Sequence, residues 1–361
     1  MDFMIEPNAA PLPADQRAEI LADPGFGKYF TDNMAVLNWN AEAGWTNPEV
    51  RALAPFSMHP AASVLHYGQE IFEGMKAYRH ADGSIWLFRP EANARRFARS
   101  ARRLALPELP EQDFLDSVSA LVRTDQDWVP EYAEGDERSL YLRPFMFAAE
   151  AFLGVRPAAE VIYCLIASPA GPYFAGGVKG VTLWVSTNYT RAAPGGTGAA
   201  KCGGNYAASL AAQLEAAEHG CEQVLYVDGY EHAWLEESGT MNLFLITADG
   251  ELVTPGLGTI LEGVTRSSVL ALAEEHGLRP VERRVGLTEL REGCADGRIT
   301  EIFAAGTAAV ITPIKGFRGE GYEVGVGTGE PGKQTVAIRD HLLDIQYGRT
   351  ADKHGWLHRV G

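Results

Sequence analysis

Lys201 lies in the segment GGTGAAKCGGNYAASLAAQ, among glycines and alanines and just ahead of a predicted helix. Only 7 of the 31 basic residues are lysines, so a lysine here is notable. A lysine amine, unlike an arginine guanidinium, can lose its proton and attack a carbonyl carbon. Burial among small residues would lower the pKa of this amine. The segment predicts a Schiff-base lysine; the alternative is a solvated lysine on a flexible loop.

Two adjacent glutamates, Glu236 and Glu237, end a predicted strand in LEESGTMNLFLI, and Gly239 then turns the chain. If side chains alternate along the strand, one carboxylate points toward the interior or a crevice. A buried carboxylate needs a cationic partner. The protonated ring nitrogen of pyridoxal 5′-phosphate (PLP) would be such a partner. The alternative is that both glutamates lie at an exposed strand end.

Two small-residue turns have the composition of phosphate-binding loops. In LEGVTRSSVLALAEEHG, Gly263, Val264 and Thr265 enter a predicted helix, whose first N–H groups and dipole favour an anion. AAGTAAVITP places Gly306 and Thr307 in a second turn. The chain has neither a Walker-type loop nor a G-x-G-x-x-G fingerprint, so an NTPase or a dinucleotide-binding protein is not supported.

The elements that position these residues alternate between strand and helix. Segments 74–78 and 84–88 flank an Ala-Asp-Gly turn and predict a hairpin. A helix is predicted over 90–106 because Pro90 is favoured at a first helical position. Most arginines of this helix are expected on a solvated face, but Arg96, beside Phe97, can reach inward.

Further along the chain, the apolar pattern predicts more strands and one helix. The helix after Lys201 runs for roughly four turns and is ended by Gly220. The Gly- and Pro-rich stretch 168–180 predicts a linker between domains 1–167 and 181–361. We therefore expect two α/β (α+β) domains with a crevice between them. The predicted strands are 139–148, 160–168, 181–186, 223–228, 232–237 and 242–247.

Composition excludes several classes of partner. The formal net charge of −16 argues against nucleic acid and anionic membranes, which select basic surfaces. No apolar segment approaches membrane-spanning length, and the acidic, Pro-rich start is not a signal or transit peptide. Four widely spaced cysteines match neither a disulfide framework nor a metal site. We expect a cytoplasmic protein that binds small molecules and no metal.

Taken together, these segments resemble the branched-chain amino acid aminotransferases, which are PLP enzymes of fold type IV. The resemblance covers nearly the whole chain, and the order of its motifs makes coincidence implausible. It implies two α/β domains with the cofactor in the crevice between them. The motifs are FGKYFTDNMAVLNWNAEAGW, LHYGQEIFEGMKAYR, YLRPFMF, AAKCGGNYAASL, EESGTMNLFLI, GVTRSSVL, GTAAVITPI and DKHGW.

The resemblance assigns roles to residues of this sequence. Lys201 matches the lysine that forms the Schiff base with PLP and carries the proton between the substrate Cα and C4′ of the cofactor. Glu237 matches the glutamate that bonds the pyridine nitrogen, and Tyr206 the tyrosine beside the 3′-oxygen. The residues implied for the phosphate are Arg96, the backbone of Val264 and Thr265, and Thr307.

The resemblance also implies an aromatic, mostly apolar substrate pocket, which favours Leu, Ile and Val side chains by burial. Arg143 would receive the second carboxylate of glutamate, and the backbone of Thr307 and Ala308 the first. The implied reaction transfers the amino group between L-Leu, L-Ile or L-Val and 2-oxoglutarate, as in branched-chain amino acid biosynthesis, in a homodimer. The pocket residues implied are Phe26, Phe72, Tyr141 and Thr240, with Tyr67 from the neighbouring subunit.

Other enzymes of this fold remain alternatives, namely D-amino acid aminotransferase and aminodeoxychorismate lyase. The motif FTDNMAVLNW and the pair Tyr141 and Arg143 favour the branched-chain family over both. A non-catalytic PLP-binding protein is a further alternative, which intact Lys201 and Glu237 disfavour. Some animal members carry a C-x-x-C redox switch after the position of Thr307; here the run is TAAVIT, so that form of regulation is not expected.

Overall fold

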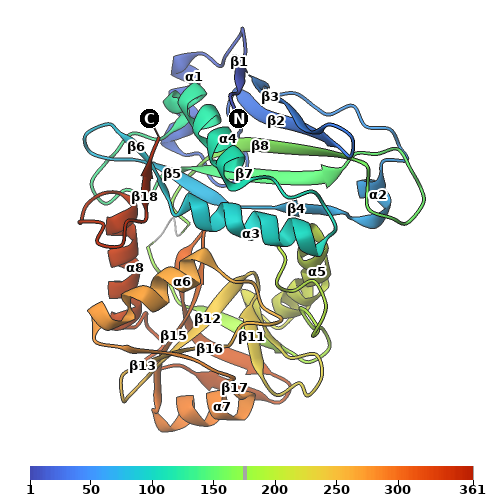
Figure 1. Cartoon of the computed structure of the whole chain (residues 1–361). Coiled ribbons are helices and arrows are strands. Elements are labelled where there is room, and N and C mark those ends of the chain that lie inside the picture. The colour runs from blue at the N-terminus through green and yellow to red at the C-terminus, as the bar shows by residue number, and fades with distance from the viewer. Residues whose placement is uncertain (174–176, 361) are drawn as a thin grey trace. The chain divides into compact units, whose positions relative to one another are not determined.

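A computed structural model describes residues 1–173 and 177–360 of the 361-residue chain (Figure 1). The described chain forms two compact units. The first comprises Met1–Tyr173 together with Ala200–Gly203 and the C-terminal segment from Asp344, and the second comprises the intervening residues up to Leu343. Both units combine helices with a sheet, so the α/β class is confirmed. The linker 168–180 falls partly outside the described residues, and the predicted domain division stays a prediction.

The sheet of the first unit has nine strands in the order β1-β3-β2-β8-β7-β5-β6-β18, with β4 paired to β7. The β1–β3 pair is parallel, and the remaining neighbours are antiparallel. The strands are β1 (Met4–Glu6), β2 (Asn33–Asn40), β3 (Gly44–Ala52), β4 (Glu70–Phe72), β5 (Met75–Arg79), β6 (Ile85–Phe88), β7 (Ser139–Ala148), β8 (Glu160–Ala170) and β18 (Leu357–Arg359).

Two amphipathic helices, α3 (Pro90–Arg103) and α4 (Glu111–Thr124), pack on this sheet and on each other (Figure 1). Phe97 of α3 lies 5.5 Å from Phe114 of α4 and 5.7 Å from Tyr163 of β8, measured between ring centroids. This aromatic core fixes the inner face of α3. The other helices of the unit are α1 (Ala14–Ala22), α2 (Ser63–Tyr67) and the 3₁₀ turn η1 (Gln126–Trp128).

The sheet of the second unit also has nine strands, in the order β11-β10-β9-β16-β15-β12-β13-β14, with β17 paired to β16 and β11 also paired to β12. Parallel pairs (β10–β9, β16–β9, β13–β14) and antiparallel pairs are mixed. The strands are β9 (Val181–Ser186), β10 (Gln223–Val227), β11 (Leu235–Ser238), β12 (Met241–Thr247), β13 (Glu251–Thr254), β14 (Arg279–Glu282), β15 (Ile299–Gly306), β16 (Val310–Gly319) and β17 (Tyr322–Gly325).

Both faces of this second sheet are covered, as the alternation along β10 shows. Val224 and Tyr226 pack with Ala212 and Ala216 of α5, whereas Leu225 and its neighbour Val227 belong to the cluster that includes the α7 side chains. Successive side chains point to opposite faces of a strand, so α5 and α7 lie on opposite faces. The helices are α5 (Gly203–Glu218), α6 (Val264–Leu272), η2 (Ala273–His276), α7 (Leu287–Asp296) and α8 (Lys333–Gln346), which crosses into the first unit at Asp344.

Most sequence-predicted elements are confirmed, with two corrections of extent. The helix predicted over 90–106 ends at Arg103, because Ala105 adopts a left-handed φ of 53° that a helix cannot continue. The strand predicted over 232–237 begins only at Leu235, because the Asp228 carboxylate binds the N–H groups of residues 230, 231, 233 and 234 and closes them into a loop. Within residues 1–173 and 177–360, no helix is long and apolar enough to cross a membrane.

Candidate active site

The backbone around Lys201 is bound to the first unit by three hydrogen bonds. The Lys201 N–H donates to Ser100 Oγ of α3 at 2.9 Å, and the Phe72 N–H of β4 donates to the Lys201 carbonyl at 2.9 Å. The Gly203 N–H donates to the Glu70 carboxylate. The residue that starts α5 is therefore held by β4 and α3, which explains why Ala200–Gly203 belongs to the first unit.

The side chain of Lys201 runs toward an aromatic face and two charged groups. Its Nζ lies 4.6 Å from the centroid of the Phe72 ring. Burial, with the Arg96 guanidinium acting in the same direction, lowers the pKa of Lys201 to about 8, although Glu73 and Tyr141 act to raise it. A substantial fraction of this amine is therefore neutral near pH 8, as a nucleophile requires.

Arg96 forms a buried ion pair with Glu73, a residue that was not predicted from the sequence. Arg96 Nε and Nη2 donate to the two Glu73 oxygens at 2.7 and 2.8 Å, and the side chains are 4% and 0% exposed. Asn93 Nδ2 also donates to Glu73 at 2.8 Å. Burial raises the pKa of Glu73, but the Arg96 guanidinium outweighs it, so the pKa lies below its ordinary value. Glu73 is thus a carboxylate that neutralises Arg96.

The predicted aromatic substrate residues of the first unit lie together. Tyr141 and Arg143 are alternate residues of β7, so they share a face of the sheet. Arg143 Nη2 donates to the Tyr141 hydroxyl at 3.1 Å, and the guanidinium lies 4.9 Å from the Phe72 ring centroid. The Phe26 ring meets the edge of Tyr141 at 5.0 Å. These four residues and Lys201 form an aromatic cluster with one guanidinium.

Tyr67 lies elsewhere in the same unit. It ends α2 and is 43% exposed, and its hydroxyl donates to the Leu153 carbonyl. The centroid of its ring lies 6.1 Å from that of His66. An exposed tyrosine is compatible with the predicted role in a neighbouring subunit, which stays a prediction.

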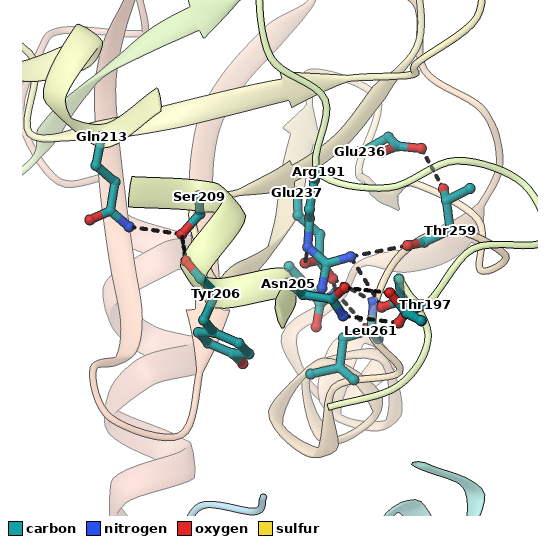
Figure 2. A network of polar contacts seen from close by, with 12 residues as sticks. Arg191, Thr197, Asn205, Tyr206, Ser209, Gln213, Glu236, Glu237, Thr259 and Leu261 are labelled. Carbon is teal, nitrogen blue, oxygen red and sulfur yellow. Dashed lines mark hydrogen bonds and ion pairs between the residues drawn. The ribbon is translucent and has the colours of Figure 1, made fainter. Parts of the chain in front are cut away.

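Glu237 is the centre of a polar network in the second unit (Figure 2). Arg191 Nε lies 2.5 Å from Glu237 Oε2, and the two side chains are 6% and 2% exposed. Oε1 accepts from Asn242 Nδ2 at 3.0 Å and from the Leu261 N–H at 2.7 Å. Arg191 Nη1 is in turn fixed by two backbone carbonyls, of Gly198 and Thr259. The carboxylate is therefore held rigidly in a desolvated, charge-compensated position.

Both members of the glutamate pair are buried, which corrects the expectation that strand alternation sends one of them inward. Glu236 and Glu237 are 5% and 1% exposed. Leu225 of β10 pairs with Ser238 of β11, whereas Val227 pairs with Leu235, so Tyr226 alone faces both glutamates. This is a β-bulge, in which two residues of one strand oppose one of the other and alternation fails locally.

A two-residue hairpin follows the glutamates and supplies Asn242. Gly239 and Thr240 connect β11 to β12, and Gly239 has φ 57°, which favours glycine. The hairpin places Asn242 directly opposite Glu237. This partner could have been predicted, because a two-residue turn brings residues five apart into register. Thr240 itself is exposed at the turn.

The two predicted phosphate turns have the expected secondary structure. Gly263 precedes α6, no side chain caps this helix, and Val264 and Thr265 are its first residues. A Cβ on Gly263 would overlap Asn242 Oδ1, so α6 begins close to the Glu237 network. Thr307 and Ala308 form the turn between β15 and β16.

Tyr206 projects from the first turn of α5, on the opposite side from Ser209 and Gln213 (Figure 2). The structure thus groups the predicted residues by unit: Lys201, Arg96, Phe26, Phe72, Tyr141 and Arg143 in the first, and Tyr206, Glu237, Thr240, Val264, Thr265, Thr307 and Ala308 in the second. Arg191 was missed because its segment, NYTRAAPGG, carries no local signal for a distant carboxylate. Among the described residues, no group of three or more His, Cys, Asp or Glu could hold a metal ion.

Comparison with known proteins places this chain among aminotransferases. The profile of the family described as "Amino-transferase class IV" matches residues 70–317. A branched-chain-amino-acid aminotransferase of Mycolicibacterium smegmatis is 52% identical over 100% of this chain and 98% of its own. A probable branched-chain-amino-acid aminotransferase of Streptomyces coelicolor is 53% identical over 99% of this chain and 98% of its own.

Solved structures give the same result. The branched-chain amino acid aminotransferase of Escherichia coli superposes with a TM-score of 0.75 at 28% identity, covering 91% of this chain and 99% of that one. A second branched-chain amino acid aminotransferase, from the organism abbreviated T.th. and solved with pyridoxamine 5′-phosphate, superposes with a TM-score of 0.72 at 28% identity and the same coverage. The fold is therefore that of these enzymes.

Proposed function

Because the chain belongs to the class IV aminotransferase family, we propose that it is a branched-chain amino acid transaminase with PLP as its cofactor. It exchanges the amino group between L-leucine, L-isoleucine or L-valine and 2-oxoglutarate. The observation that carries this proposal is the 52% identity, over the whole chain, to a relative that bears this name. Lys201 and Glu237 supply the reactive groups that such a reaction needs.

The residues present fit PLP. The Lys201 amine, with its pKa lowered to about 8, suits a covalent link to an aldehyde. The Glu237 carboxylate, kept charged by Arg191, suits a protonated pyridine nitrogen. The start of α6, which no side chain caps, suits a phosphate. We propose that Arg96, Thr307 and the backbone of Val264 and Thr265 hold this phosphate, and that Tyr206 holds the 3′-oxygen.

PLP, when bound, supplies an aldehyde that captures amines and a ring that accepts electrons from the substrate Cα. Lys201 Nζ binds the cofactor at rest, takes the proton from Cα once it is displaced by the substrate amine, and returns it one atom away. Glu237 Oε keeps the proton on the ring nitrogen. Arg191 keeps Glu237 ionised, so that the carboxylate holds this proton rather than taking it.

The aromatic cluster of the first unit suits both kinds of substrate. Phe26, Phe72 and Tyr141 offer apolar surface, which favours branched aliphatic side chains at roughly 25 cal/mol per Å² buried. We propose that Arg143 binds the second carboxylate of glutamate. Within the described residues, its Nε has no hydrogen-bond partner, so it retains a donor for that carboxylate. Thr240 and the backbone of Ala308 complete the proposed set.

We also propose that the protein is a cytoplasmic homodimer in which the partner subunit contributes its own Tyr67. Sedimentation of the purified chain tests the dimer, and a monomer with full activity would contradict it.

An absorbance titration tests the function. Addition of L-leucine to the purified yellow protein should remove the band of the lysine-linked cofactor, and 2-oxoglutarate should restore it. D-leucine, added in parallel, should leave the band unchanged. A colourless protein, or a band that responds to D-leucine and not to L-leucine, would contradict the proposal.

A further inference from the structure

Two buried carboxyl groups share one guanidinium in the second unit. The β-bulge turns Glu236 and Glu237 toward the same side of β11, opposite Tyr226. Arg191 forms the ion pair with Glu237, and its charge also acts on Glu236. With both carboxyl groups ionised, the three side chains carry one net negative charge; with one protonated, they are neutral.

Glu236 is linked to Arg191 through Thr259 (Figure 2). The Thr259 hydroxyl donates to Glu236 Oε1, and the Thr259 carbonyl accepts from Arg191 Nη1 at 3.0 Å. Within the described part of the chain, the buried Glu236 Oε2 has no hydrogen-bond partner. A chain of contacts therefore runs from Glu236 through Thr259 and Arg191 to Glu237, and its far end keeps one buried oxygen without a donor.

We propose that Glu236 is a positioning residue that shares Arg191 with Glu237 and thereby sets how strongly Glu237 attracts the protonated ring nitrogen of the cofactor. This inference rests on the proposed function, because it gives Glu237 that partner. When Glu236 is neutral, Arg191 is opposed by Glu237 alone. When Glu236 is charged, it draws on the same guanidinium, and the field at Glu237 becomes more favourable to a cation.

The groups around Glu236 make it the one that responds to pH. Burial raises the pKa of Glu236, Glu237 and Asp228 act in the same direction, and Thr259 and Arg191 oppose them. Although burial acts against it, backbone N–H groups lower the pKa of Asp228 to about 2. Burial raises the pKa of Tyr226 to about 12. Asp228 and Tyr226 therefore keep their charge states between about pH 5 and pH 9.

The test uses pyridoxamine 5′-phosphate, which carries the same ring but forms no covalent link with Lys201. Its affinity for the cofactor-free protein is measured by calorimetry between about pH 5 and pH 9. Wild type should gain affinity over Glu236→Gln as pH rises, from equality at the acid end to about tenfold at the alkaline end. Glutamine still accepts from Thr259, and titration of the ligand phosphate cancels between the two proteins.

Glu231→Gln is the matched control, because it removes one negative charge from a half-exposed carboxylate five residues away. It should follow wild type. Equal affinities for wild type and Glu236→Gln at every pH, or an equal loss in the control, would overturn the inference. Failure of every protein to bind the ligand would instead overturn the proposed function.

A second variant keeps the test independent of the folding of Glu236→Gln. Thr259→Val removes the hydroxyl bond that lowers the pKa of Glu236, so the rise in affinity should move to higher pH. An unchanged pH dependence in a folded Thr259→Val protein would count against the inference.

Discussion

Each unit of the molecule contains one buried arginine–glutamate pair, and the two pairs serve opposite purposes. In the first unit, Arg96 and Glu73 lie 2.7 Å apart, and the guanidinium helps to lower the pKa of the neighbouring Lys201. In the second, Arg191 and Glu237 lie 2.5 Å apart, and the carboxylate is the group offered to a ligand. The cation matters in one pair and the anion in the other.

The difference shows that the neighbours of a buried ion pair, and not the pair itself, decide its chemistry. Glu73 accepts from Asn93, and Glu237 accepts from Asn242, so both carboxylates are anchored by an amide as well as by arginine. What differs is a lysine beside one pair and a second carboxyl group, Glu236, beside the other. The following variants separate these contributions, from the largest expected effect to the smallest.

Lys201→Ala removes the reactive amine of the first unit. We expect turnover to fall at least about 10⁴-fold, because the covalent link and the proton carrier are both lost. Cofactor should still bind without a covalent bond. Transamination assays and borohydride trapping with peptide mapping measure the two effects. Lys315→Ala, at an exposed lysine, is the control, and substantial residual turnover in the Lys201 variant would contradict the assignment.

Glu237→Gln changes the reactive group of the second unit. We expect about a 10²- to 10³-fold loss of kcat, because an amide cannot hold the ring proton by a charge-assisted bond. Glu218→Gln, at the exposed end of α5, should retain wild-type rates. Single-turnover kinetics with L-leucine provide the measurement. Wild-type rates in Glu237→Gln would remove its proposed role.

Arg96→Met and Arg191→Met each leave a buried carboxylate without its guanidinium. We expect each to lower the free energy of unfolding by about 3–5 kcal/mol at neutral pH. The exposed pair of Arg102 and Glu108 should show less than about 1 kcal/mol for Arg102→Met. Urea denaturation measures these changes.

The deficits of the two buried variants should shrink as pH falls. A buried carboxylate without its cation has a raised pKa, so it takes up a proton before its unfolded counterpart does, and the cost of its charge disappears. Deficits that stay constant toward about pH 4 would show that lost packing, not charge, is responsible.

The pH dependence of PLP capture by the cofactor-free protein isolates the lysine side of the comparison. The pKa of Lys201 is lowered from 10.5 to about 8, so the neutral amine, and with it the rate, should rise about tenfold per pH unit up to about pH 8 and then level off. Arg96→Met removes one lowering influence, so its bend should move to higher pH. A wild-type rate that still rises at about pH 10 would contradict the lowered pKa. Stopped-flow absorbance provides the measurement.

Local pattern was sufficient to predict most elements and the position of the reactive lysine. The helix after Lys201 and strands such as β7 and β9 follow from apolar runs bounded by glycine and proline. The inward reach of Arg96 followed from its place beside Phe97 on α3. These features depend on neighbours within a few residues, which a sequence displays directly.

What could not be predicted depends on contacts between distant segments. Glu73 and Arg191 complete their ion pairs from other elements, and nothing in their own segments indicates a partner. The bulge at Glu236 was missed because it arises from the register with β10, so simple alternation gave the wrong orientation for one carboxylate. The roles assigned to the site residues by family resemblance remain predictions that the variants above test.

The assignment of Ala200–Gly203 to the first unit has a consequence for protein engineering. A chimera of two relatives, joined near residue 177, would take Lys201 from one parent and its backbone partners Phe72 and Ser100 from the other. Recombinants should therefore carry this tetrapeptide with the N-terminal parent. In this fold the natural unit of exchange is discontinuous in the gene, and a single crossover cannot respect it.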